Sequence, residues 1–326
     1  MKVTVLGAGA WGTALALVLE RSLHDVTLWG HDAEHLAEMQ RVGTNERYLP
    51  AIKLPSAWNY EPDLARAISG AEAVVVAVPS KAFRTVTAAL KDFSGVVVSV
   101  TKGIEHETGL TMCGVLRENA PAARLAALSG PTLALEVAKG VPSAIVAASA
   151  DMPVARQVQG MFHTVPFRVY ASADLTGVEM GGALKNVVAI AAGVCDGFGF
   201  GDNSKAALLT RGIGEIRRLG VACGALPETF AGLSGLGDLT VTCFSRLSRN
   251  RGFGERLGRG EKLADILAKS VSIAEGYPTA KSAYRLARAK TVSTPIIDEI
   301  YAVLYGGKEV ARALRDLIGR ESKAED

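Results

Sequence analysis

The chain has 326 residues with 36 Lys and Arg against 33 Asp and Glu, a formal net charge of +3. So small a charge, spread along the chain, argues against a broad nucleic-acid-binding surface. Hydrophobic residues make up 48% and charged residues 21%, which excludes a disordered chain. The four cysteines are far apart and form no CxxC pair, so we expect no metal site and no disulfide framework. Reduced thiols fit the cytoplasm.

The N-terminus has no charged segment followed by an apolar run, and no stretch of 18 uncharged apolar residues indicates a membrane span. We therefore expect a cytoplasmic protein without membrane insertion. Glycine is enriched, at 35 of 326 residues against a usual share of about 7%. This excess indicates many places where the backbone turns tightly or where another group, from the protein or a ligand, approaches the backbone closely.

Short β-branched runs alternate with helical patterns in the first half of the chain. The predicted strands are 2–6, 25–29, 73–78, 96–99, 125–128, 143–148 and 167–170. The predicted helices are 11–21, 33–41, 81–91 and 152–162. Continuous apolar runs suit strands that are covered on both faces, and strand–helix alternation is typical of a doubly wound α/β domain. We predict a Rossmann-type domain over residues 1–175.

The pattern of predicted secondary structure changes after residue 175. From there on, the sequence shows long helical patterns and almost no strand signal. The predicted helices are 178–194, 205–220, 262–268, 280–289 and 295–305. We predict an all-helical C-terminal domain over residues 176–326. Its oligomeric state is left open, although an apolar helical domain could dock a second copy to form a homodimer.

The segment Gly7-Ala8-Gly9-Ala10-Trp11-Gly12 lies between the first predicted strand and the first predicted helix, as a dinucleotide-binding fingerprint requires. Gly7 would allow the tight turn, Gly9 the approach of the pyrophosphate, and Gly12 close packing of helix on strand. The phosphates would lie at the helix N-terminus. The alternative is a plain turn.

The choice of cofactor depends on the end of the second strand, Trp29-Gly30-His31-Asp32. An acidic residue at the strand tip favours NAD, whereas His31 could meet the 2′-phosphate of NADP. Alternatively, both residues begin the next helix, with Asp32 as its N-cap. The pattern favours NADP slightly over NAD.

Three further loops follow predicted strands, where open α/β sheets bind ligands. Pro79 would lie near the nicotinamide ribose. Lys102 places a cation over the crevice, which suits a phosphorylated substrate, although a solvated loop lysine is the alternative. The loop 129–132 can present backbone N–H groups to a small anion or a cofactor edge.

Lys185 interrupts an otherwise small and apolar helical segment, 179–191. A buried lysine is costly unless it is paired, and a buried, paired lysine can exchange a proton with a carbonyl. Asp238, within a glycine-rich apolar segment, is the candidate partner. The alternatives are a lysine that snorkels to the surface and an aspartate that only caps a helix starting at residue 239.

Ser248-Arg249-Asn250-Arg251 opens a further helical stretch. A hydroxyl, a guanidinium and an amide at a helix N-terminus make a good phosphate receptor. A solvated face or a nucleic-acid contact are the alternatives.

Together these segments resemble the NAD(P)-dependent glycerol-3-phosphate dehydrogenases, specifically the bacterial single-polypeptide type. The matching stretches are 6–16, 78–80, 82–84, 101–105, 129–131, 183–187, 201–203, 210–212, 235–239, 248–250 and 274–276. They follow the family's order over nearly the whole chain. The resemblance implies a Rossmann-type sheet followed by a helical domain, similar in fold to 6-phosphogluconate dehydrogenase.

The resemblance also implies roles for individual residues. Lys185, oriented by Asp238, would be the proton donor and acceptor, and Lys102 the second active-site lysine. The substrate-binding positions are Lys102, Gly130, Thr132, Lys185, Asn186, Asp238, Thr242, Ser248, Arg249 and Asn250. The cofactor-binding positions are Gly7, Gly9, Ala10, Trp11, Gly12, His31, Pro79, Lys102, Ala134, Arg249, Ile273 and Glu275.

The implied activity is reversible hydride transfer that reduces dihydroxyacetone phosphate to sn-glycerol 3-phosphate, supplying glycerophospholipid synthesis. Thr132-Leu133 stands where Ser-Phe is commoner in the family, and Ser234 where Ala is usual. These departures bear on the shape of the pocket. The alternatives are another two-domain dehydrogenase, such as a β-hydroxyacid or ketopantoate reductase, and a catalytically silent nucleotide sensor.

Overall fold

The computed structural model describes residues 1–269 and 274–321. The chain forms two compact units. The sheet unit comprises Met1–Glu105 and Leu110–Glu179, and the helical unit comprises His106–Gly109 and Met180–Asp326. Helix α8 (Leu175–Gly197) begins in the sheet unit and continues through the helical unit. The sequence placed the division at residues 175/176, in the first turn of this helix.

The sheet unit is built on eight strands in the order β10-β9-β8-β7-β6-β1-β2-β5. They are β1 (Lys2–Leu6), β2 (Asp25–Trp29), β5 (Asn59–Glu61), β6 (Ala73–Val76), β7 (Val96–Ser99), β8 (Arg124–Ser129), β9 (Ser143–Ala148) and β10 (Phe167–Ser172). All seven predicted strands are present, and the short polar β5 was missed. The strands from β5 to β8 are parallel, whereas β9 runs antiparallel to β8 and parallel to β10.

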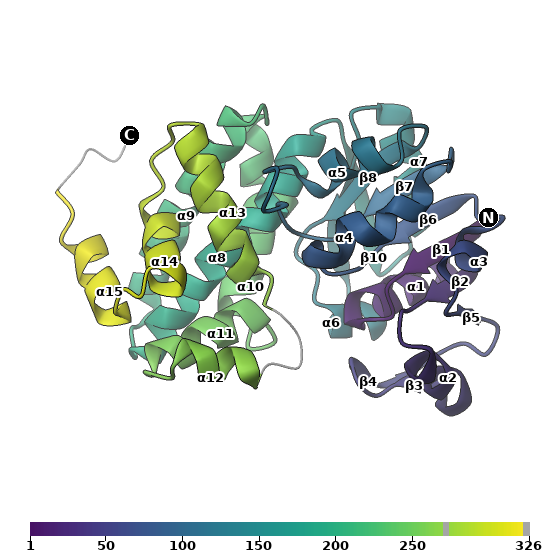
Figure 1. The fold of residues 1–326 in the computed structure, drawn as a ribbon, viewed down its shortest axis with the longest axis horizontal. Helices are drawn as coiled ribbons and strands as arrows, with labels where there is room; N and C mark the ends of the chain where they lie inside the picture. The colour runs from purple at the N-terminus through teal and green to yellow at the C-terminus, as the bar shows by residue number, and fades with distance from the viewer. Residues whose placement is uncertain (270–273, 322–326) are drawn as a thin grey trace. The chain divides into compact units, whose positions relative to one another are not determined.

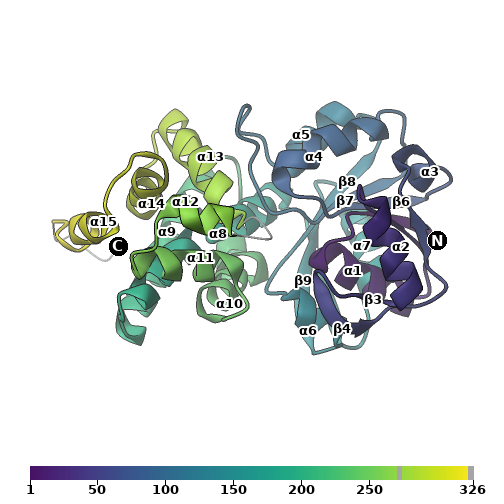
Figure 2. The same cartoon turned by 60° about the horizontal axis from the view of Figure 1, so that its bottom comes forward.

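Helices cover both faces of this sheet. They are α1 (Ala10–Arg21), α2 (Ala33–Val42), α3 (Leu64–Ile68), α4 (Ser80–Thr87), α5 (Met112–Asn119), α6 (Ala134–Ala138) and α7 (Met152–Phe162). Figure 2 shows α4 and α5 on one face and α1, α6 and α7 on the other. Val75 packs with the second group and its neighbours Val74 and Val76 with the first, because side chains alternate along a strand. Burial on both faces explains the continuous apolar run.

A two-stranded hairpin of β3 (Thr44–Asn45) and β4 (Leu49–Lys53) follows α2. The sequence did not predict it, because its strands are short. Leu49 and Ile52 are buried in the same apolar cluster as α1. The hairpin therefore packs close to the glycine-rich turn.

The helical unit confirms the predicted all-helical fold, since every regular element in the described part of residues 180–321 is a helix. Its helices are α8, α9 (Asp202–Ala222), α10 (Asp238–Phe244), α11 (Arg249–Gly258), α12 (Leu263–Ala268), α13 (Gly276–Ala289), α14 (Pro295–Tyr305) and α15 (Val310–Ile318). Two short turns, Pro227–Ala231 and Leu233–Gly237, precede α10. In Figure 1, α8 runs through the middle of the unit.

Helix α8 is long and apolar enough to cross a membrane, with a mean hydropathy of 1.4 over its most apolar window, but 94% of that window is buried within the protein. Burial of this kind is typical of the core helix of a globular protein.

Helices α8 and α11 lie backbone to backbone. A Cβ atom built on Gly254 would lie 1.9 Å from the carbonyl oxygen of Ile190, and one built on Gly193 would lie 1.9 Å from that of Arg251. Only glycine permits this approach, so part of the glycine excess serves helix packing as well as turns. The crossing sets the position of α11 on α8.

Candidate active site

The glycine-rich turn has the geometry that a dinucleotide requires. Gly7 adopts a φ of +126°, and its N–H donates to the carbonyl oxygen of Trp29 at 2.9 Å. A Cβ atom on Gly12 would lie 1.9 Å from the oxygen of Gly7, so the turn closes only with glycine there. Gly9 precedes α1 without a side-chain cap, and no atom lies within 4 Å of the position its Cβ would take. Space is therefore open beside the uncapped N-terminus of α1, which includes Ala10.

Two further observations fit a cofactor at this turn. The indole Nε1 of Trp11 is buried and has no hydrogen-bond partner within the described residues. The buried side chain of Asn45, on the β3–β4 hairpin, donates to the oxygen of Ala8 at 3.0 Å and to Oγ1 of Thr13 at 2.8 Å. Asn45 braces the turn. Sequence reasoning missed it, because the hairpin that carries it left no clear signal.

At the tip of β2, Asp32 has the helix-capping role that the sequence left as an alternative. One carboxylate oxygen accepts the N–H of His35 at 3.0 Å, and the other pairs with the guanidinium of Arg47 at 3.1 Å. These contacts and desolvation act on the carboxyl in opposite directions; the hydrogen bond from His35 is the larger effect and lowers its pKa. His31 is exposed beside it. The strand tip thus carries an imidazole and a guanidinium.

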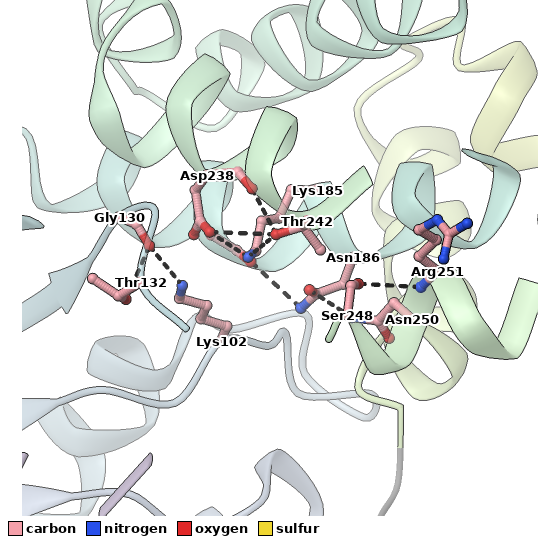
Figure 3. Close-up of polar contacts among 11 residues, drawn as sticks. Lys102, Gly130, Thr132, Lys185, Asn186, Asp238, Thr242, Ser248, Asn250 and Arg251 are labelled. Carbon is pink, nitrogen blue, oxygen red and sulfur yellow. Dashed lines mark hydrogen bonds and ion pairs between the residues drawn. The ribbon is translucent and has the colours of Figure 1, made fainter. Parts of the chain in front are cut away.

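A second cluster in the sheet unit surrounds Lys102, whose Nζ donates to the carbonyl oxygen of Gly130 at 3.2 Å (Figure 3). The hydroxyl of Thr132 donates to the same oxygen, also at 3.2 Å. The Lys102 loop is anchored by Glu105, which accepts two hydrogen bonds from the guanidinium of Arg84 at 2.7 and 2.6 Å. Lys102 is half-buried and held in place, unlike a solvated loop lysine.

The remaining cofactor positions of the sheet unit lie at helix starts. Pro79 precedes α4 as its N-cap, and Ala134 is the first residue of α6. In the helical unit, Glu275 is the N-cap of α13. Ile273 lies outside the described residues.

Lys185, Asp238 and Thr242 form a buried polar group in the helical unit (Figure 3). The ammonium of Lys185 donates to a carboxylate oxygen of Asp238 and, at 2.6 Å, to the hydroxyl of Thr242. The side chains of Lys185 and Asp238 are only 7% and 1% exposed. The predicted ion pair is therefore present in the structure, and the snorkelling lysine is wrong.

The hydroxyl of Thr242 donates to the backbone oxygen of Asp238 at 2.6 Å. Because this hydroxyl uses its hydrogen for Asp238, its oxygen accepts a hydrogen bond from Lys185. The Thr242 hydroxyl and the Asp238 carboxylate therefore both orient the ammonium. Asp238 is the first residue of α10, but its side chain serves Lys185 and does not cap the helix.

The predicted phosphate receptor lies at the N-terminus of α11. Ser248 is the N-cap, and its Oγ accepts the N–H of Arg251 at 3.2 Å. The side chain of Asn250 donates to Asn186 at 2.8 Å and accepts the N–H of Gly276 at 2.9 Å. Arg249 is exposed. The side chains of Ser248 and Asn250 thus form hydrogen bonds within the protein and stabilise the turn. The sequence had predicted both as phosphate ligands and did not indicate these internal contacts.

The structure brings the predicted residues together in three groups. In the sheet unit these are the glycine-rich turn and the cluster around Lys102. In the helical unit, Asn186 links Lys185, its neighbour on α8, to Asn250 on α11. A buried lysine with two oriented acceptors can transfer a proton, and the α11 N-terminus can bind an anion.

Comparison with known proteins agrees with this description. The sequence-family model named NAD-dependent glycerol-3-phosphate dehydrogenase N-terminus matches residues 2–155. The family model named NAD-dependent glycerol-3-phosphate dehydrogenase C-terminus matches residues 174–315. The glycerol-3-phosphate dehydrogenase [NAD(P)+] of Geobacter sulfurreducens is 48% identical over 99% of this chain and 98% of its own length. That of Desulfotalea psychrophila is 46% identical with the same coverage.

Solved structures give the same picture. The crystal structure of glycerol-3-phosphate dehydrogenase from Coxiella burnetii covers 98% of this chain and 99% of its own, with a TM-score of 0.94 and 35% identity. A ketopantoate reductase from Ralstonia eutropha shares the fold alone, at a TM-score of 0.62 and 17% identity. The two family models and the near-complete coverage of relatives that are 46–48% identical show that this chain belongs to the NAD(P)-dependent glycerol-3-phosphate dehydrogenase family.

Proposed function

We propose that the protein interconverts dihydroxyacetone phosphate and sn-glycerol 3-phosphate with NADP or NAD. The buried group of Lys185, Asp238 and Thr242 carries this proposal, because such a group has a clear use in carbonyl reduction. A nucleotide sensor without catalysis has no need for a buried lysine held by two acceptors. Ionisable groups that are paired and buried in this way tend to mark catalysis.

In the reducing direction, bound nicotinamide supplies the hydride that C2 of the ketone receives. Lys185 donates a proton from its ammonium to the C2 oxygen, so the ketone gains a hydride and a proton and becomes an alcohol. Asp238 and Thr242 hold the ammonium in one direction, which positions the proton for transfer. In the oxidising direction the neutral amine accepts the hydroxyl proton.

The substrate phosphate would be held at the N-terminus of α11. The first N–H groups of a helix have no acceptor within the helix, and the helix dipole favours an anion there. Arg249 is exposed at this end and adds a guanidinium. Since the side chains of Ser248 and Asn250 are bonded within the protein, we assign phosphate binding chiefly to backbone N–H groups and Arg249. Lys102, with Gly130 and Thr132, would make the remaining substrate contacts.

NADP is the favoured cofactor because Asp32 is committed to capping α2 and to Arg47, while His31 and Arg47 can meet a 2′-phosphate. The burial of α8 supports a protein without membrane insertion. We further propose that it acts in the cytoplasm. Its product would supply glycerophospholipid synthesis.

A spectrophotometric assay tests the proposal. Purified protein is given dihydroxyacetone phosphate or dihydroxyacetone, each with NADPH and NADH, and cofactor oxidation is followed. We expect rapid oxidation with the phosphorylated ketone and at least 100-fold lower kcat/KM with dihydroxyacetone, since phosphate contacts contribute about 3 kcal/mol or more. Equal rates with both ketones, or oxidation of neither cofactor, would refute the proposed function.

A further inference from the structure

A second ionic network lies in the helical unit, away from Lys185. The carboxylate of Asp196, near the end of α8, pairs with Nζ of Lys205 on α9 at 2.5 Å and with Nε of Arg251 on α11 at 2.6 Å. These three side chains are only 9–13% exposed. Arg251 also pairs with Glu255 at 3.3 Å, and Glu255 pairs in turn with Arg259, so the network contains three cations and two carboxylates.

This network lies too far from the chemistry to take part in it. Asp196 follows Lys185 by eleven residues on the same helix, which is about three turns and about 16 Å. Three turns return to the same face of the helix, so both residues face the same side of α8. One face of α8 therefore carries the proposed catalytic lysine and, further along, the partner of Arg251.

Arg251 connects this network to the phosphate receptor. Its guanidinium forms an ion pair with Asp196, in which Nε lies 2.6 Å from the carboxylate without the alignment of a hydrogen bond. Its backbone N–H donates to Oγ of Ser248, the N-cap of α11 (Figure 3). The glycine contacts between α8 and α11 bring the backbones together at this level, since Gly193 lies against the carbonyl of Arg251. The side-chain ion pair then restricts how α11 can rotate or slide on α8.

Lys205 holds Asp196 from the other side. Its ammonium is buried, and it also lies 5.0 Å from the centre of the Phe244 ring at the end of α10. Helix α10 carries Asp238 and Thr242. Asp196 thus pairs with Lys205 on α9 and with Arg251 on α11. Lys205 also contacts α10 through Phe244.

We propose that Asp196 is a positioning residue for the phosphate-binding turn: through Arg251 it fixes the N-terminus of α11 relative to Lys185. The inference rests on the proposed function, because it assigns the α11 N-terminus to the substrate phosphate. A rotation of this turn displaces the phosphate receptor without altering the contacts of Lys185. Loss of the Asp196 carboxylate should therefore weaken phosphate binding and leave proton transfer by Lys185 intact.

The experiment compares Asp196→Asn with the wild-type chain. We expect kcat/KM for dihydroxyacetone phosphate to fall about 10-fold, mainly through KM, because misplaced binding groups lose affinity before they lose chemistry. Inhibition by inorganic phosphate, competitive with the substrate, should weaken by a similar factor. The kcat/KM for dihydroxyacetone, which lacks the phosphate, should stay within twofold.

Glu261→Gln is the matched control, because it breaks an ion pair with Arg256 at the other end of α11. It should leave all three measurements within twofold. If Asp196→Asn does not fold, Lys205→Met loosens Asp196 from one side, and the same selective loss is expected.

Two outcomes overturn the inference: full activity of a folded Asp196→Asn on the phosphorylated ketone, or an equal loss with both ketones. The second outcome would show a general structural role. The proposed function fails separately, when the wild-type chain itself shows no preference for the phosphorylated ketone.

Discussion

The ammonium of Lys185 and the carboxylate of Asp238 form an ion pair that is almost completely buried. Enclosing two charges is costly, and removing one partner of a buried pair typically costs about 3–5 kcal/mol. A pair with this cost, whose ammonium is also bonded to Thr242, is consistent with the proton-transfer role proposed for Lys185.

Replacing Lys185 with Ala should lower kcat about 10²–10⁴-fold, as expected when a general acid–base is lost. Binding of NADPH should be little affected, because Lys185 is not among the proposed cofactor-binding positions. Steady-state kinetics and fluorescence titration with NADPH measure the two effects. Full turnover by the variant would refute the assigned role.

Replacing Arg249 with Ala should raise the KM for dihydroxyacetone phosphate about 10–100-fold, because a hydrogen bond to a charged group contributes about 1.5–3 kcal/mol. Arg246→Ala is the control, since Arg246 is also exposed and lies three residues before Arg249, outside α11. Initial-rate kinetics measure both. An unchanged KM for Arg249→Ala would remove this residue from the phosphate site.

Arg47 should decide cofactor preference. Arg47→Ala is expected to raise the KM for NADPH about 10-fold and to leave that for NADH within twofold, because only NADPH carries the 2′-phosphate. Arg41→Ala, which removes an exposed arginine in the last turn of α2, should change neither value. A parallel change for both cofactors would place Arg47 outside the specificity site.

Glu215 should make stability depend on pH. Its buried carboxylate accepts the N–H groups of Ile296 at 2.8 Å and Ile297 at 3.3 Å, at the start of α14. Desolvation raises its pKa from 4.5 to about 7. The folded state binds the proton of the Glu215 carboxyl more tightly than the unfolded state does. The protonated carboxyl therefore stabilises the fold fully below pH 4.5, and this stabilisation is lost as pH rises through 7.

The difference in free energy of unfolding between the wild type and Glu215→Gln should therefore move by about 2.5 kcal/mol against the wild type from pH 5 to pH 8. Urea unfolding at several pH values measures it. Glu228→Gln, at an exposed position, should show no such trend. Parallel profiles for the wild type and Glu215→Gln would contradict the expectation.

The contact of α8 with α11 predicts opposite effects for two glycines on one helix. Gly254→Ala should destabilise the protein by about 3 kcal/mol or more, because its Cβ would lie 1.9 Å from the oxygen of Ile190. Gly252→Ala has open space and should stabilise by about 0.5–1 kcal/mol. Thermal unfolding distinguishes them, and equal stabilities would mean that the crossing is looser than described.

The sequence by itself determined the main strands and helices and the candidate site residues on them. Continuous apolar runs predicted the main strands, because burial on both faces leaves no polar positions to interrupt them. The glycine-rich turn was recognisable because its spacing reflects local backbone geometry, and Lys185 stood out as a charge within an apolar helix.

Only the tertiary structure decided which groups meet. The pairing of Lys185 with Asp238 joins positions 53 residues apart, and sequence could offer it only as a candidate. The bracing role of Asn45, the use of the Asn250 side chain as a link to Asn186, and the joining of Asp196 to Arg251 left no local signal. Such contacts depend on how helices and hairpins pack, and packing is a property of residues distant in sequence.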